Sequence, residues 1–135
     1  MKRKGQLMNK SDLMNVGFTE STASEIIRCV KTQLAREGLG LYNNPRIGVV
    51  PTERIIEFLI GESGKQLSSQ ETVEFLKDEI IHRDELIKRG IPKATANYLI
   101  KQAQQTMTDV GFIFYKNTRR WYAPTKMINQ LLGGK

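Results

Sequence analysis

The sequence contains few of the residues that metal sites and disulfides need. It has one cysteine and one histidine among 135 residues. A lone cysteine excludes an internal disulfide, and these two residues cannot supply the roughly four ligands of a zinc site. No run approaches the roughly 18 consecutive apolar residues of a membrane span, and MKRKGQLMNK lacks the apolar segment of a secretory signal. We therefore expect a cytoplasmic protein without a metal, a cofactor or a membrane partner.

Residues suited to catalysis are equally scarce. His82 lies in an acidic stretch and Cys29 within an expected helix, so neither has an evident partner for nucleophilic catalysis. A solvated histidine and a buried or half-buried cysteine are the simpler interpretations. The sequence also has no glycine-rich phosphate loop. We expect no enzymatic activity.

Charge is present in excess and is segregated along the chain. The net charge is +7, and residues 1–11 carry four basic groups and no acid. Residues 62–84 carry three basic and six acidic groups, whereas residues 85–135 carry nine basic and two acidic groups. A solvated surface would account for basic residues in general, but their concentration in one region indicates a polyanionic partner.

Two stretches of the chain repeat each other at a constant offset. GLGLYNNPRIGVVPTERIIEFL begins at Gly38, and GFIFYKNTRRWYAPTKMINQLLG begins at Gly111. Aligning residues 12–61 with 85–134 without a gap gives thirteen identical positions, which include glycines, prolines and apolar helix positions. We call this alignment the repeat register. It predicts two tandem units with the same fold.

Within the first unit, the pattern predicts a short helix from Ser11 to about Gly17 and a longer one over 19–37. Two strand-like runs, 39–42 and 47–50, then flank a polar turn and predict a β-hairpin wing. A third helix begins at Pro51. The second unit repeats this order, with Asp84 expected to cap its first helix.

The predicted fold class is therefore mainly α with small β-hairpins, in two tandem winged helix-turn-helix units (α-α-β-β-α) joined by an amphipathic helix. The expected boundaries are a basic arm at 1–10, unit 1 at 11–61, an acidic helical connector at 62–83 and unit 2 at 84–135.

This order of elements, with a closing helix that begins at a proline, resembles the excisionase and MerR-like winged helix-turn-helix proteins. DELIKRGIPKATANYLIKQ and FIFYKNTRRWYAPTKMINQLL carry the likeness in unit 2. DLMNVGF, GLGLYNN and VVP in unit 1 resemble a family of short proteins encoded beside integrases on bacterial mobile elements. The resemblance implies a double-stranded DNA-binding accessory protein, either an excisionase (recombination directionality factor) or a transcriptional regulator. An integrase or other recombinase is an implied partner.

The candidate DNA contacts follow from the helix-turn-helix and wing positions. The start of the second helix enters the major groove in such motifs, where Asn suits adenine and Lys suits guanine or phosphate. Basic wing residues suit phosphates or the minor groove, and Trp121 either packs in the core or stacks on nucleic acid. The candidates are Lys93, Thr95, Asn97, Tyr98, Lys101, Lys116, Arg119, Arg120 and Trp121 in unit 2, with Arg28 and Arg46 in unit 1.

An alternative function belongs to another class. Unit 1 places Glu20 and Glu25 where DNA phosphates would lie, and the connector is acidic. Unit 1 and the connector are then expected to form a protein-interaction adaptor that docks a recombinase or replication protein, or that forms a homodimer. Both functions can coexist in one chain.

Overall fold

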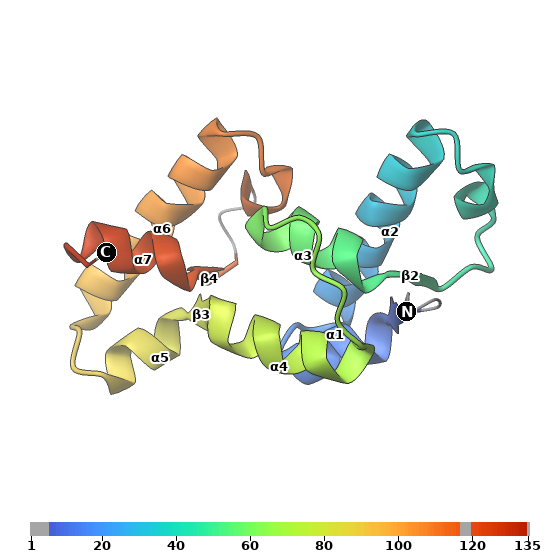
Figure 1. Ribbon diagram of the computed structural model, residues 1–135. Helices are drawn as coiled ribbons and strands as arrows, with labels where there is room; N and C mark the ends of the chain where they lie inside the picture. Colours follow the sequence, from blue (N-terminus) through green and yellow to red (C-terminus); the bar gives the residue numbers. More distant parts are fainter. Residues whose placement is uncertain (1–5, 117–119, 135) are drawn as a thin grey trace. The chain divides into compact units, whose positions relative to one another are not determined.

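The computed structural model describes residues 6–116 and 120–134. It divides the chain into two compact units between Leu76 and Lys77. Each unit contains a helix-turn-helix pair, a 3-10 helix, a small two-stranded sheet and a closing helix (Figure 1). The predicted class, mainly α with two similar tandem units and small antiparallel strand pairs, is confirmed.

The first unit is built from seven elements of the described chain. They are β1 (Leu7–Asn9), α1 (Lys10–Val16), α2 (Glu20–Arg36), the 3-10 helix η1 (Gly40–Asn43), β2 (Val49–Pro51), α3 (Thr52–Ile60) and α4 (Ser69–Glu79). Helix α4 is the predicted amphipathic helix, and its chain continues across the division between the units. Val73 and Leu76 are among its buried residues, as the predicted amphipathic character requires.

The second unit repeats this order after α4. Its elements are β3 (Ile80–His82), α5 (Arg83–Lys88), α6 (Lys93–Asp109), the 3-10 helix η2 (Ile113–Lys116), β4 (Tyr122–Pro124) and α7 (Thr125–Leu131). Each of these elements begins at the position that the repeat register assigns to its counterpart in unit 1, from Leu7 and Ile80 to Thr52 and Thr125. The duplication seen in the sequence is therefore also a duplication of structure.

In each unit one strand precedes the helix pair in the sequence, the other strand follows it, and the two strands pair with each other. Strand β1 runs antiparallel to β2, with Met8 opposite Val50, and β3 runs antiparallel to β4, with Ile81 opposite Ala123. These central residues are all buried. The sheet therefore contributes to the core and fixes the start of the first helix next to the start of the closing helix.

The predicted pairing within each wing is wrong. Residues 40–43 form η1 instead of a strand, and β2 pairs with β1, which precedes the first helix. Residues 113–116 likewise form η2, and β4 pairs with β3. Gly38 and Gly111, with φ of 99° and 105°, turn the chain sharply after the long helix. The apolar residues that follow continue in a helical turn and do not extend.

The caps of the first helices also differ from expectation. Asn9, and not Ser11, caps α1, because its Oδ1 accepts from the Asp12 amide while the Asp12 carboxylate accepts from the Asn9 amide. His82, and not Asp84, caps α5 through Nδ1, which accepts from the Asp84 amide at 3.1 Å. Both units therefore begin earlier than expected. Residues 7–10 form β1 and the start of α1, and residues 80–83 form β3 and the start of α5.

Apolar faces of the long helices form the two cores. In unit 2, Ala96, Leu99, Ile100 and Ala103 of α6 pack with residues of β3, α5, β4 and α7. The corresponding residues of α2 in unit 1 are also buried, and they are Ala23, Ile26, Ile27 and Val30. Among residues 6–116 and 120–134, none of the helices has the length and apolar composition that crossing a membrane requires.

Candidate nucleic-acid interface

The exposed side of α6 carries cations and neutral polar groups. Lys93, Thr95, Tyr98 and Lys101 are exposed, and Tyr98 retains 62% of its surface. Asn97 is half-buried at the edge of this face. No carboxylate occurs in the sequence between Glu85 and Asp109. The start of α6 is therefore free of the groups that would repel phosphates.

Trp121, just before β4, has a cation of α5 and a cation of α6 against its ring. The Arg83 guanidinium lies 4.2 Å and the Lys101 ammonium 5.1 Å from the centre of the indole ring. Arg83 donates to Asn97 Oδ1 at 3.1 Å, and the Arg83 amide donates to the Trp121 carbonyl at 2.7 Å. The faces of an indole attract cations. Arg83, Asn97, Lys101 and Trp121 thus form one arrangement, which we call the Trp121 cluster.

The Trp121 ring also contacts the core. It is half-buried and packs against the apolar cluster formed by α6 and its neighbours. The sequence left open whether this residue packs or stacks on a ligand. In the structure it packs on the core, with the half-buried Arg83 guanidinium and the exposed Lys101 ammonium against its ring.

Arg120 does not face solvent as a wing residue would. It is only 8% exposed, its guanidinium donates to the Phe114 carbonyl at 2.9 Å, and it lies 4.6 Å from the centre of the Phe114 ring. This burial directs its charge into the unit and argues against the expected contact with phosphates, which stays a prediction. Lys116 is exposed at the end of η2. Arg119 lies outside the described residues.

Gln104 of α6 holds this segment in place. Its side chain is 2% exposed and donates to the carbonyls of Arg120 and Tyr122 at 2.7 and 3.1 Å. Tyr115 packs edge-on against Phe114, with ring centres 5.0 Å apart, and burial raises the pKa of its hydroxyl. Arg120 is therefore held by contacts from both α6 and η2.

The same positions of unit 1 have mixed charge. Lys10, the counterpart of Arg83, forms an ion pair with Glu20 at 2.8 Å, and its hydrogen bond lowers the pKa of that carboxyl. Arg28 is exposed and lies 4.0 Å from Glu25. Arg46 is exposed in the turn before β2, and its amide donates to Asn44 Oδ1. The two candidate arginines of unit 1 therefore do not share a single basic face.

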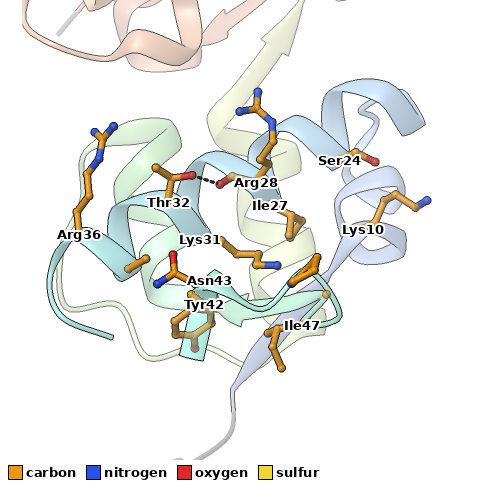
Figure 2. Close-up of a pocket in the computed structure, with 13 residues that line it drawn as sticks. Lys10, Ser24, Ile27, Arg28, Lys31, Thr32, Arg36, Tyr42, Asn43 and Ile47 are labelled. Carbon is orange, nitrogen blue, oxygen red and sulfur yellow. Dashed lines mark hydrogen bonds between the residues drawn. The ribbon is translucent and has the colours of Figure 1, made fainter. Parts of the chain in front are cut away.

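A groove opens in unit 1 between α2 and the segment around η1. It encloses about 820 Å³. Its lining contains Ile27, Tyr42 and Ile47, and it contains four basic side chains but no carboxylate. Figure 2 shows Arg36 and Lys10 at opposite ends of the groove, with Lys31 reaching across it toward the 42–47 segment. Lys31, the counterpart of Gln104, donates to the Asn44 carbonyl at 2.9 Å.

Both units match one known sequence family. The family described as Domain of unknown function (DUF3173) matches residues 6–63 and again residues 79–135. The chain belongs to this family. The two matches begin at residues 6 and 79. These residues are equivalent positions in the repeat register, which the helices and strands also follow. No curated protein and no solved structure matches the chain.

The two DUF3173 units use equivalent positions differently. Trp121 corresponds to Gly48, Arg120 to Ile47, and Lys93 to Glu20. At the first two positions, unit 2 has large side chains that contact Arg83 and Phe114, whereas in unit 1 Ile47 and Gly48 line a groove. The third difference decides the sign of the charge at the start of the long helix.

Sequence reasoning missed two residues of this arrangement. The expected boundaries place Arg83 in the connector, and the sequence pattern assigns no role to Gln104. Lys10 and Arg83 are both basic and occupy equivalent positions when the repeat register is extended, so the duplication contained the signal for Arg83. Within the described residues, no three His, Cys, Asp or Glu side chains are grouped as a metal site would require.

Proposed function

We propose that the second DUF3173 unit binds double-stranded DNA through α6 and the Trp121 cluster. The observation that carries this proposal is the exposed start of α6, which combines Lys93, Thr95, Tyr98 and Lys101 with no carboxylate. It follows the turn of a helix-turn-helix pair, where the second helix of such motifs reads the major groove.

The chemistry of each group suits a different part of the duplex. Lys93 and Lys101 supply charge for phosphates or guanine, and Thr95 and Tyr98 supply hydroxyl groups at the exposed face. The hydrogen bond from Arg83 fixes the side chain of Asn97, whose Oδ1 retains a second lone pair while Nδ2 offers a donor. Asn97 therefore keeps the paired donor and acceptor that suit adenine.

The biological role that we propose is that of an accessory DNA-binding protein of a mobile element. The likeness to excisionase and MerR-like sequences supports this role, either in recombination beside an integrase or in transcriptional regulation. Both roles place the protein in the cytoplasm. In each role unit 2 holds the duplex.

A mobility-shift titration of the full-length protein over a range of salt concentrations tests the proposal. If Lys93 and Lys101 each neutralise one phosphate, the double variant Lys93→Ala/Lys101→Ala lowers the slope of log K against log salt by about 1.8. Lys126→Ala is the matched control, because it removes one exposed charge of unit 2 on α7. Equal slopes for the wild-type protein and the double variant, or no binding at low salt, would reject this interface.

Unit 1 supports a second candidate function, that of a protein-interaction adaptor. Glu20 and Glu25 lie on the face of α2 that corresponds to the basic face of α6. Carboxylates there are unfavourable for phosphate contact, so this face suits a partner other than a nucleic acid. We infer that the two units have different partners.

A further inference from the structure

The duplication allows the groove of unit 1 to be compared with the same place in unit 2. In unit 2, the centre of the Trp121 indole lies 4.2 Å from Arg83 and 5.1 Å from Lys101. The equivalent positions of unit 1 are Gly48, Lys10 and Arg28, and all three line the groove. Unit 1 therefore retains the two flanking cations but has no side chain where unit 2 has the indole.

The surroundings of the groove are also less filled than in unit 2. Leu41 is 61% exposed and Tyr42 is half-buried, whereas their counterparts Phe114 and Tyr115 are 4% and 1% exposed. Ile47 lines the groove at the position where Arg120 is buried in unit 2. Apolar surface that the second unit covers with its own side chains thus faces solvent in the first.

Charge restricts what can cover this surface. The lining contains Lys10, Arg28, Lys31 and Arg36 and no acidic residue. Glu20 and Glu25 pair with Lys10 and Arg28 from outside the lining, so two positive charges remain in excess. An occupant with an apolar ring and negative charge beside it complements both properties of the groove.

We propose that the groove of unit 1 binds an aromatic side chain presented by an acidic segment of a partner protein. The aromatic ring takes the place that Trp121 takes in unit 2, between Lys10 and Arg28 and over Ile27 and Ile47. The acidic residues beside it face Arg36 and the neighbouring cations. This inference does not rest on DNA binding by unit 2.

A protein occupant fits the groove better than a nucleic acid does. The position between the two cations is taken in unit 2 by an amino-acid side chain, and the lining of the groove combines its cations with the apolar side chains of Ile27 and Ile47. A duplex passing over α2 would also bring its phosphates toward Glu20 and Glu25. Nucleic-acid binding in the groove is the competing outcome of the test below.

The decisive variant is Gly48→Trp, which copies into unit 1 the residue of unit 2. No atom lies within 4 Å of a Cβ placed on Gly48, and its φ is not in the left-handed region, so the backbone accepts a side chain. The introduced indole should occupy the groove and prevent binding. Gly48→Ala is the matched control, because it changes the same backbone position and leaves the groove open.

The probes are short synthetic peptides added to isotope-labelled full-length protein, with binding followed through the NMR methyl signals of Ile27 and Ile47. One peptide has Trp between acidic residues, a second has Ala in place of Trp, and a third has Trp between lysines. We expect the first to bind at least about tenfold more tightly than the second, because it buries an indole. The third should bind more weakly than the first, because its charge is opposite.

The result that supports the proposal is binding of the acidic Trp peptide to the wild-type protein and to Gly48→Ala but not to Gly48→Trp. Arg36→Ala provides a second variant that does not fill the groove, and it should weaken binding of the acidic peptide several-fold. Equal binding to Gly48→Trp and wild type would overturn the proposal. So would shifts at Ile27 and Ile47 with a single-stranded oligonucleotide or a DNA duplex when none of the peptides causes them.

Discussion

Replacing Arg120 with alanine distinguishes a structural arginine from a DNA-contacting one. The substitution removes a buried hydrogen bond of 2.9 Å to the Phe114 carbonyl and a guanidinium 4.6 Å from the Phe114 ring. A hydrogen bond from a charged group contributes about 1.5–3 kcal/mol, and a desolvated cation–π contact about 2 kcal/mol. Relief of the desolvation of the buried charge offsets part of this sum. We therefore expect Arg120→Ala to lower the free energy of unfolding of unit 2 by about 2 kcal/mol or more.

Trp121 makes this measurement specific to unit 2. It is the only tryptophan of the chain and packs on the core of that unit, so its fluorescence during urea denaturation reports the unfolding of unit 2. With an m-value of about 1 kcal/mol/M, the urea midpoint should fall by about 2 M. Arg89→Ala is the control, because Arg89 is exposed and pairs with Glu85 only at the surface. It should change stability by less than about 0.5 kcal/mol.

The contrary result is equally well defined. If Arg120 contacted DNA instead, Arg120→Ala would leave the urea midpoint unchanged and would lower the salt slope of DNA binding by about 0.9. That pair of results would refute the reasoning from burial. A variant that binds DNA with an unchanged slope at temperatures where unit 2 remains folded would support it.

Two further predictions concern single interactions in the two units. Gln104→Leu removes the donor to the Arg120 and Tyr122 carbonyls and should destabilise unit 2 by about 1–3 kcal/mol; an unchanged urea midpoint would contradict this. In unit 1, the hydrogen bond from Arg54 holds the pKa of the Glu37 carboxyl below its usual 4.5. Its stabilising effect is therefore present above the unfolded-state pKa and is lost as the pH falls through the lower folded-state value. Glu37→Gln should lose less stability than the wild-type protein as the pH falls below 4.5, as measured by thermal unfolding, and identical pH profiles would exclude this linkage.

The helices were predictable because their signals are local. Apolar residues at helical spacing placed α2 and α6, and the glycines at 38 and 111 end both helices as expected. The repeat was predictable for a different reason. It preserves these local signals in one register over two units, so that each unit supports the interpretation of the other.

The strands were harder to predict because their partners are distant in sequence. Strand β1 has only three residues, Leu7–Asn9, and it pairs with residues about forty positions later. The run Leu39–Tyr42 has the composition of a strand, yet most of it lies in η1 and both of its leucines are exposed. Composition at so short a length does not separate a strand from a helical turn.

The orientation of individual charged side chains was not predictable from the pattern. Arg120 lies next to Arg119 and Trp121 in a basic segment, yet its charge is buried. The Gln104 side chain donates a hydrogen bond to the Arg120 carbonyl, and the Arg120 guanidinium donates one to the Phe114 carbonyl. Conversely, Arg83 falls in the acidic connector by composition but lies over the indole of Trp121. Tertiary contacts that join α5, α6 and β4 decide both cases, and no local rule includes them.

The comparison of the two units explains how one fold can acquire two surfaces. The order and register of the elements and the buried helix faces are shared, so the scaffold does not require different residues at positions 48 and 121 or at positions 20 and 93. Gly48 lines a groove at the position where unit 2 has the Trp121 indole, and Glu20 places a carboxylate where Lys93 places a cation. A hollow with mixed charge around it favours a specific side-chain ligand, whereas a filled and uniformly basic surface favours a polyanion. Substitutions at positions 48 and 121, or at positions 20 and 93, should therefore change these binding properties most directly.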